Sequence, residues 1–256
     1  NPPADLDPPV VVCDTPDGAW HAGNVSLACT VTDNASGLSD PSDAVFSMST
    51  AVPSGVEDIN AATGSRIVCD AVGNCATAGP IAGNMIDRKV PTITISSPVG
   101  GAEYQLNGVI ESGYTCADAG AGIASCVGTV SSGSPIDTSS PGAKTFVVTA
   151  IDAAGNTTVT TAGYVVLTAV ESLQRIAAEL RVIIDGSRPP LTARATNALQ
   201  KVEDAIAELN EAPPDTHHAA IRIRQAAQQI EGLRNQGWLP PAVANSLLTR
   251  LSGVSW

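Results

Sequence analysis

The pattern of apolar and polar residues changes once along the chain, at about residue 167. Before this point, short runs rich in Val, Thr, Ile and Ser alternate with turn residues about every 8–12 positions, which is typical of the strands of a β-sandwich. After it, apolar residues recur at every third or fourth position, as on one face of an amphipathic helix. The sequence therefore predicts a mainly β part followed by an all-α part.

The β part contains a series of strand-like runs. The strongest is residues 144–151, Lys-Thr-Phe-Val-Val-Thr-Ala-Ile, because β-branched and aromatic side chains favour strands. The expected strands are residues 10–13, 25–31, 44–48, 66–69 and one between 76 and 86, followed by 92–96, 109–117, 123–127, 144–151 and 157–167.

Two turn sequences occur twice in this part. Residues 33–38, Asp-Asn-Ala-Ser-Gly-Leu, return as Asp-Ala-Gly-Ala-Gly-Ile at 118–123, and Asp-Ala-Val-Gly-Asn at 70–74 returns as Asp-Ala-Ala-Gly-Asn at 152–156. In such turns Asp accepts backbone N–H groups and Gly supplies a positive φ. The duplication predicts two similar β modules before the helical tail. We expect three domains, with the boundaries 1–88, 89–167 and 168–256.

The tail carries four apolar stripes of helical period. They run over residues 170–183, 191–209, 220–233 and 243–251. Expected ends are a capping box at Thr168 and Glu171, a stop at Gly186, a cap at Asp215 or Thr216, and a proline start at Pro240 and Pro241. The third and fourth stripes repeat the first two at an offset of about 50 residues. Two such helical hairpins should close into a four-helix bundle.

Charge is divided unevenly between the two parts. Residues 1–167 carry 16 acidic and four basic side chains, whereas residues 168–256 carry nine of each, so the net charge of −12 belongs to the β part. An acidic surface repels phosphate backbones, which argues against nucleic acid as a partner. No window approaches about 18 uninterrupted apolar residues, so we expect no membrane insertion.

The six cysteines fall into three close pairs, and six cysteines allow 15 pairings that spacing alone does not resolve. Cys69 and Cys75 flank a turn and Cys13 and Cys29 bracket a loop, so facing antiparallel positions would bring each pair within disulfide range. Intervals of 15, 5 and 9 residues do not suit the close cysteine pairs of a zinc site. We expect disulfides, which imply an oxidising, extracytoplasmic compartment. The expected bonds are Cys13–Cys29, Cys69–Cys75 and Cys116–Cys126.

The β part resembles the bacterial Ig-like repeats of secreted surface proteins. The resemblance covers about residues 8–167 and is carried by residues 17–21, 29–38 and 69–75, by the joint-like stretch 87–93, and by 150–156. It implies two Ig-like β-sandwiches in tandem. Because the Ig-like fold serves many roles, the resemblance says little about function.

The tail resembles the FIMAH-type helical domain that ends many bacterial secreted proteins and hydrolases. The resemblance spans residues 170–254, through 198–209 and 237–244, and most of its matches are Leu and Ala periodicity. The resemblance implies a helical domain, with no binding residues that can be carried over to this chain. We interpret it as an interaction or end-capping module.

Candidate catalytic chemistry is sparse. The histidines are interpreted as a turn residue, His21, and as two solvated residues, His217 and His218, that point about 100° apart on a helix. No nucleophile elbow, phosphate loop or zinc-protease helix motif occurs. Among the few aromatics, Trp238 is expected where the third and fourth helices meet, and Trp256 is expected to be exposed. We therefore expect no enzyme activity and no catalytic residues.

Aspartates of the duplicated turns are candidate Ca²⁺ ligands at the domain joints. In an Ig-like topology the two turns of a module lie at one pole, which faces the segment that precedes the module. Clustered carboxylates there could bind Ca²⁺ and stiffen a stalk, although Asp is also a common turn former. The residues concerned are Asp33 and Asp70 with Asp5 and Asp7, and Asp118 and Asp152 with Asp87.

These observations favour a non-catalytic extracellular spacer and interaction region of a secreted or cell-surface bacterial protein. Residues 1–5, Asn-Pro-Pro-Ala-Asp, lack an initiator Met and a signal peptide, which suggests a mature piece of a larger polypeptide. Each sandwich should be about 35–45 Å long. The partner could be an extracellular polymer, a glycan or a protein. Two alternatives stay open: an accessory C-terminal region of an extracellular hydrolase or oxidoreductase, and a surface-filament subunit whose proline-rich start is a donor strand.

Overall fold

The computed structural model describes residues 5–187 and 191–256. These residues form fourteen β-strands, a short 3-10 helix between the third and fourth strands, and four α-helices that all follow the last strand. The strands are β1 Val10–Cys13, β2 Trp20–His21, β3 Ser26–Thr32, β4 Val45–Ser49, β5 Glu57–Ala61, β6 Arg66–Cys69, β7 Cys75–Ala78, β8 Asn84–Asp87, β9 Thr92–Ser97, β10 Glu103–Gln105, β11 Gly113–Ala117, β12 Ile123–Gly128, β13 Gly142–Asp152 and β14 Thr157–Leu167. The helices are η1 Pro41–Ala44, α1 Ala169–Asp185, α2 Leu191–Leu209, α3 Thr216–Asn235 and α4 Pro241–Ser252. The predicted β part followed by a helical part is confirmed.

The described residues pack into two compact units. Unit 1 combines the chain up to Thr94 with Tyr114–Gly128 and Val148–Thr160. Unit 2 combines Ile95–Gly113 and Thr129–Val147 with the chain from Thr161 onward. The division into three domains stays a prediction.

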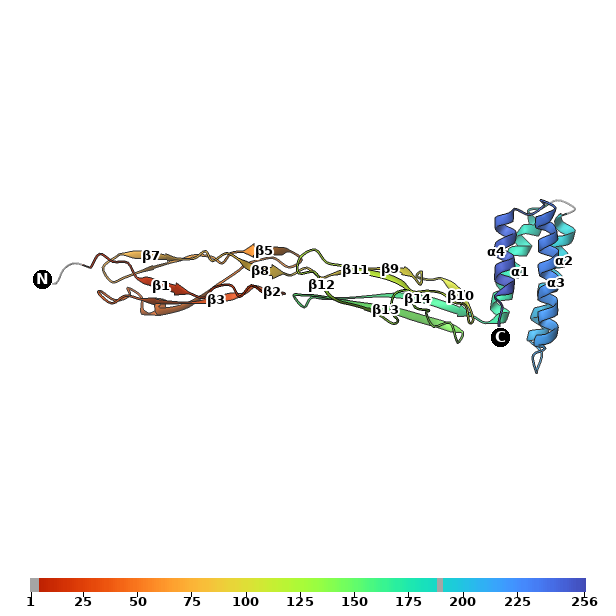
Figure 1. Cartoon of the computed structure of the whole chain (residues 1–256), viewed down its shortest axis with the longest axis horizontal. Coiled ribbons are helices and arrows are strands. Elements are labelled where there is room, and N and C mark those ends of the chain that lie inside the picture. The colour runs from red at the N-terminus through yellow and green to blue at the C-terminus, as the bar shows by residue number, and fades with distance from the viewer. Residues whose placement is uncertain (1–4, 188–190) are drawn as a thin grey trace. The chain divides into compact units, whose positions relative to one another are not determined.

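Unit 1 contains three small sheets, with the strand orders β1-β3-β4, β2-β8-β5 and β6-β7. Strand β3 shows why they form, because every second side chain of Ser26–Thr32 is buried. Its Cys29 and Val31 pack with Phe46 and Met48 of β4 in one core cluster. Figure 1 shows β1 alongside β3, which agrees with their antiparallel pairing.

The remaining strands form a four-stranded sheet of order β10-β14-β13-β12 and the pair β11-β9. One feature of pairing occurs in both halves of the β part. Trp20 of β2 pairs in parallel with Met85 of β8, and Tyr104 of β10 pairs in parallel with Val166 of β14. A short strand early in each half thus joins the last strand of that half, as expected if the two halves are structural repeats.

In unit 2 the four helices lie side by side (Figure 1), with α1 against α2 and α4, and α3 against α2 and α4. They enclose one core that includes Leu173, Ile176, Leu180, Val202, Ile223, Ile230, Leu247 and Leu251. The capping box of Thr168 and Glu171 is present at the start of α1, and Asp215 caps α3. None of the helices in the described part of the chain combines the length and the apolar character that a membrane span requires.

The strand prediction was wrong in several places. Two strands, β7 and β8, replace the single one expected after residue 76, because Gly79 has a φ of 67° and Pro80 has no N–H to donate to a ladder. Strand β11 begins at Gly113 rather than at Val109. Strands β2, β5 and β10 were not predicted. The residues Pro2 and Pro3 of the expected donor strand lie outside the described residues.

Candidate cation sites

The duplicated turn sequence Asp-Ala-x-Gly-Asn has nearly the same geometry at both of its positions. Asp70 Oδ1 accepts the backbone N–H groups of Val72, Gly73 and Asn74, and its Oδ2 accepts the Asn74 side-chain amide at 2.6 Å. Asp152 accepts the Asn156 backbone N–H and side-chain amide, each at 2.8 Å. These hydrogen bonds lower the pKa of the Asp70 carboxyl against the opposing effect of its burial. Both carboxylates are therefore held in fixed orientations.

The second duplicated loop lies beside the first in each repeat. The backbone N–H of Ala71 donates to Gly37 O, and that of Ala153 donates to Gly122 O, both at 2.9 Å. Gly37 and Gly122 have φ values of 77° and 79°, which a glycine adopts without strain. The equivalent loops are consequently joined in the same way in both repeats, which places Asp33 near Asp70 and Asp118 near Asp152.

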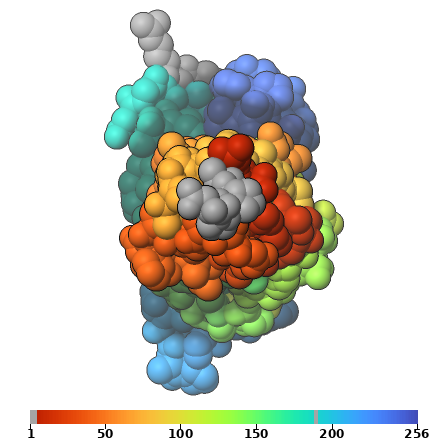
Figure 2. Space-filling view, turned by 90° about the vertical axis from the view of Figure 1, so that its left-hand side faces the viewer, coloured from red at the N-terminus to blue at the C-terminus, as the bar shows by residue number. Residues whose placement is uncertain are grey.

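An asparagine side chain then ties each pair of loops to the segment that precedes it. Asn74 Nδ2 donates to the Asp5 carbonyl at 3.2 Å, and Asn156 Nδ2 donates to the Asp87 carbonyl at 2.9 Å. We call each of these arrangements an asparagine clasp. Figure 2 shows the red start of the described chain beside orange and yellow segments of unit 1.

The clasps bring two groups of carboxylates together. Asp5, Asp33 and Asp70 form one group, in which one oxygen of each lies within 4.8 Å of the others. Glu57, Asp87 and Asp118 form the second group by the same measure. Asp5, Asp33 and Asp70 were predicted to lie together, and so were Asp87 and Asp118. Asp7 and Asp152 were predicted at the same places, but neither belongs to one of these two groups.

Glu57 is the member that sequence reasoning missed. It begins β5, whose sequence Glu-Asp-Ile-Asn-Ala carries little strand signal because Glu, Asp, Asn and Ala are all depleted in strands. Its position follows from pairing, because Glu57 is the register partner of Asp87 across β5 and β8. Only the tertiary structure brings it to the Asp118 loop.

Burial and like charge dominate the second group. Asp87 is completely buried and Asp152, next to Asp118, is 1% exposed. Burial and the negative charges of Asp87, Asp152 and Glu57 raise the pKa of Asp118, against the effect of its hydrogen bond from the Gly122 N–H. Oxygen ligands held this way suit a hard divalent cation.

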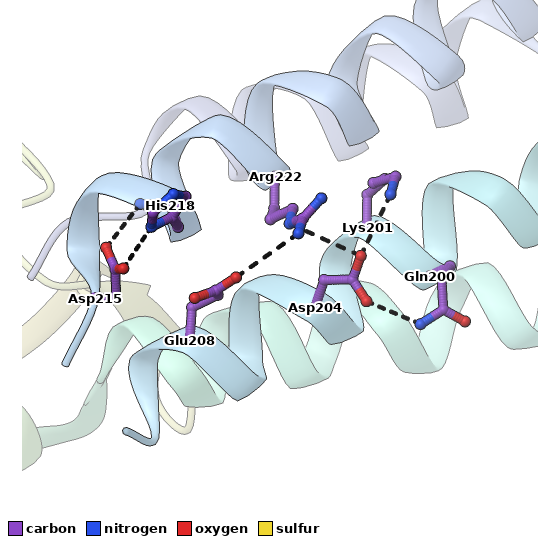
Figure 3. A network of polar contacts seen from close by, with 7 residues as sticks. All are labelled: Gln200, Lys201, Asp204, Glu208, Asp215, His218 and Arg222. Carbon is purple, nitrogen blue, oxygen red and sulfur yellow. Dashed lines mark hydrogen bonds and ion pairs between the residues drawn. The ribbon is translucent and has the colours of Figure 1, made fainter. Parts of the chain in front are cut away.

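A third group lies on the helices of unit 2. His218, Asp215 and Glu208 have ligand atoms within 4.8 Å of one another. Figure 3 shows that His218 bonds to Asp215, the residue that caps α3, while Arg222 lies between Glu208 and Asp204 at 3.8 and 3.9 Å. The Asp215 carboxylate raises the pKa of His218. Because the His218 side chain is 58% exposed and Asp215 already serves as a cap, this group fits a solvated helix end.

The other candidate residues are placed as follows. His21 was predicted as a turn residue but lies in strand β2, where it pairs with Ile86 of β8, and its side chain bonds to Asp17 at 3.0 Å. Trp238 packs partly buried against the helical core. Trp256 is 51% exposed. The disulfides of the structure are Cys13–Cys29, Cys69–Cys75 and Cys116–Cys126.

Comparison with known proteins adds little. No family model matches the chain, and no curated protein matches it. Among solved structures, the chain is similar to the Clostridium thermocellum CbhA fibronectin(III)-like modules, at 13% identity and a TM-score of 0.26, with 62% of this chain and 93% of that chain covered. At this identity and TM-score, the similarity carries no argument about function.

Proposed function

We propose that this chain is a non-catalytic extracellular spacer and interaction region of a secreted or cell-surface bacterial protein. In this proposal, residues 1–88 and 89–167 are two Ig-like β-sandwiches in tandem. Residues 168–256 are a FIMAH-type four-helix domain that contacts an extracellular polymer, a glycan or a protein. The β part holds the helical part at a distance from whatever precedes it.

The asparagine clasp is the observation that carries this proposal. A spacer needs joints that resist bending, and each clasp ties a loop of one repeat to the segment immediately before that repeat. In the second clasp, Asn156 bonds both to the Asp87 carbonyl and to the Asp152 carboxylate, which is 1% exposed. This tie is partly buried, and breaking it is costly where it leaves the buried Asp152 carboxylate without its partner.

The disulfides support the proposed compartment. All six cysteines are bonded in pairs, with sequence separations of 16, 6 and 10. Such bonds persist in oxidising environments and are typical of small secreted domains. This pairing also leaves no thiol to act as a nucleophile, which agrees with a non-catalytic role.

The helical part offers a polar groove for an interaction. The groove has a volume of about 450 Å³, and its lining combines amide side chains with Lys201 and Arg222. Lys201 and Arg222 share Asp204 as an ion-pair partner, and Arg222 also pairs with Glu208 (Figure 3). Two carboxylates thus balance the two cations, and the groove presents oriented hydrogen-bonding groups rather than net positive charge. Neutral hydroxyl-rich polymers match that chemistry better than polyanions do. Its amide lining comes from Asn197, Gln200, Gln225, Gln228 and Gln229.

Small-angle X-ray scattering of the purified chain tests the spacer role. A compact chain of this length would have a radius of gyration of about 18 Å. Tandem sandwiches in series predict a value well above this one, and a value near 18 Å would refute the spacer role. Sequence upstream of Asn1 that encodes a catalytic domain would instead favour the accessory-region alternative.

A glycan array tests the interaction role separately. We expect binding of a neutral polysaccharide that is lost in Gln225→Ala and kept in Gln236→Ala, because Gln225 lines the groove and Gln236 follows α3 outside it. Loss of binding in neither variant, or in both, would exclude the groove as the binding surface.

A further inference from the structure

We propose that Glu57, Asp87 and Asp118 bind one Ca²⁺ ion. The stiffening role of this ion rests on the proposed spacer function, but the binding itself does not. The three residues come from the start of β5, the end of β8 and the loop between β11 and β12, so a shared ion would link three separate elements of unit 1. We call Glu57, Asp87, Asp118 and the adjacent Asp152 the carboxylate cluster.

Strand register places two of these carboxylates directly opposite each other. Glu57 and Asp87 are partners in the antiparallel pair of β5 and β8. Like charges at directly opposed positions destabilise a sheet. A fold that keeps this pair, with Asp87 completely buried, needs a compensating positive charge or a bound proton.

Basic side chains supply little positive charge to balance these carboxylates. Lys89 Nζ lies 3.3 Å from Glu57 Oε1. Among the described residues, no Lys, Arg or His forms an ion pair with Asp87, Asp118 or Asp152. Four carboxylates therefore share one ammonium group.

Two oxygens in the cluster also lack any hydrogen-bond donor. Glu57 Oε2 and Asp118 Oδ1 each have less than 1 Å² of accessible surface and no partner. Unpaired carboxylate oxygens that water cannot reach are strongly unfavourable. Each Asp87 oxygen accepts one N–H group, from Lys89 or from Ala121, and keeps a second lone pair that can ligate an ion. The two orphaned oxygens have no other partner, so an ion would satisfy them.

The geometry suits Ca²⁺ among the common hard cations. All candidate ligand atoms are carboxylate oxygens, and they lie within 4.8 Å of one another. Two oxygens bound to one Ca²⁺ at about 2.3–2.6 Å can be no more than about 5 Å apart, and Ca²⁺ accepts irregular coordination completed by water. Mg²⁺ demands shorter, near-octahedral contacts and keeps more of its water.

The equivalent group in the first repeat is less suited to an ion, because it has one orphaned oxygen, Asp5 Oδ2, where the second group has two. Asp5 and Asp33 occupy the positions of Asp87 and Asp118, but one Asp33 oxygen already accepts three backbone N–H groups, from Ala35, Ser36 and Gly37. No counterpart of Glu57 belongs to that group among the described residues. The loop equivalent to Asp118 therefore supplies a matched control.

Calorimetric titration of the full chain, freed of metal by a chelator, tests the proposal. We expect saturable Ca²⁺ binding and an increase in melting temperature with added Ca²⁺. Asp118→Asn keeps the acceptor for the Gly122 N–H but removes the charge, so we expect Ca²⁺ affinity to fall by about tenfold or more. The matched variant Asp33→Asn and the neighbouring Asp58→Asn should retain wild-type affinity.

Folding of the variant is checked in the same experiment. In chelator, Asp118→Asn should melt at or above the wild-type temperature, because it removes a like charge from the carboxylate cluster. The absence of Ca²⁺-dependent heat and melting shift in the wild type would overturn the proposal and assign the cluster a bound proton. If Asp33→Asn lost as much Ca²⁺ affinity as Asp118→Asn, the proposed site would be wrong. If Mg²⁺ bound as tightly as Ca²⁺, the assignment of the ion as Ca²⁺ would be wrong. Small-angle X-ray scattering in chelator separates the Ca²⁺ site from the spacer function. A chain that is extended but does not bind Ca²⁺ would refute the site and leave the spacer function intact.

Discussion

At the scale of single residues, Gly120 controls how closely the carboxylates approach the backbone. A Cβ atom at this position would lie 2.5 Å from Glu57 Oε2 and 2.6 Å from Asp87 Oδ2. Its φ is not in the left-handed region, so space rather than backbone conformation demands a glycine here. The Asp-Ala-Gly-Ala-Gly sequence of the second repeat is therefore not interchangeable with its counterpart in the first, which has Ala35 at the equivalent position.

Gly120→Ala should destabilise the chain. Forced displacement of two buried oxygens is an overpacking defect that typically costs about 1–3 kcal/mol. Gly23→Ala is the matched control, because it has open space and no left-handed φ, and should be neutral or slightly stabilising. Denaturant unfolding measures both, and equal stabilities of the two variants would contradict the close approach.

The raised pKa of Asp118 gives a second residue-scale prediction. A carboxyl whose pKa is higher in the folded than in the unfolded chain costs stability once the pH exceeds its unfolded value. Lowering the pH through the folded pKa of Asp118 should thus reduce this cost in the metal-free chain. Melting temperatures measured in chelator at a series of pH values would show this gain in stability, and Asp118→Asn should remove it. If the melting temperature of the variant changed with pH as that of the wild type does, Asp118 would be excluded as the source.

At the scale of elements, the start of α1 depends on a reciprocal cap. The Glu171 N–H donates to Thr168 Oγ1 at 3.1 Å, and Glu171 Oε2 accepts the Thr168 N–H at 2.8 Å. The hydrogen bonds that the Thr168 N–H and hydroxyl donate to the Glu171 carboxylate lower the pKa of Glu171. The cap satisfies N–H groups that a helix start otherwise leaves without partners.

Thr168→Ala should therefore destabilise the helical part by about 0.5–2 kcal/mol. The control is Thr196→Ala, inside α2, where the hydroxyl donates to the Thr192 carbonyl and alanine is the better helix former. Thermal unfolding followed by the helical circular-dichroism signal measures both variants. A Thr196→Ala defect as large as that of Thr168→Ala would show that the cap has no special role.

Two of the disulfides differ in the loop that they close. Cys13–Cys29 has a sequence separation of 16 and Cys69–Cys75 one of 6. In the chain-entropy model the longer loop contributes about 3 kcal/mol and the shorter about 2 kcal/mol. Replacing both cysteines of a pair by alanine should cost more for Cys13–Cys29, as measured by denaturant unfolding. The reverse order would indicate that packing rather than loop closure determines the contribution.

At the scale of the whole molecule, the asparagine clasps should determine how rigid the joints are. Asn156→Ala removes the bond to the Asp87 carbonyl, whereas Asn74→Ala removes the equivalent bond to Asp5. We expect the first variant to broaden the distribution of sizes seen by small-angle X-ray scattering more than the second does. Identical scattering from wild type and Asn156→Ala would contradict a mechanical role for this clasp.

The sequence was informative where a pattern is local. Helix α2 runs from Leu191 to Leu209, the interval of its predicted stripe, and strands β1 and β6 have the predicted bounds. The duplicated loops also placed most of the aspartates that meet at the clasps. In each case, a period or a turn motif within about 20 residues contains the needed information.

The sequence was uninformative where a long-range partner determines the structure. Strand β5 exists because β8 pairs with it, although its three middle residues are exposed and two of them, Asp58 and Asn60, are polar. The contact of His218 with Asp215 and Glu208 depends on the way α3 follows α2 rather than on either helix alone. Tertiary pairing overrides weak local preference at such places.

The two asparagine clasps share one numerical property. Both join residues that are 69 positions apart, Asn74 to Asp5 and Asn156 to Asp87. Both partners of each bond therefore lie within one sequence repeat and the short segment that precedes it. A gene that gains or loses one such repeat would gain or lose one complete asparagine clasp with it. The length of the β part could then change by whole repeats without requiring a new kind of contact.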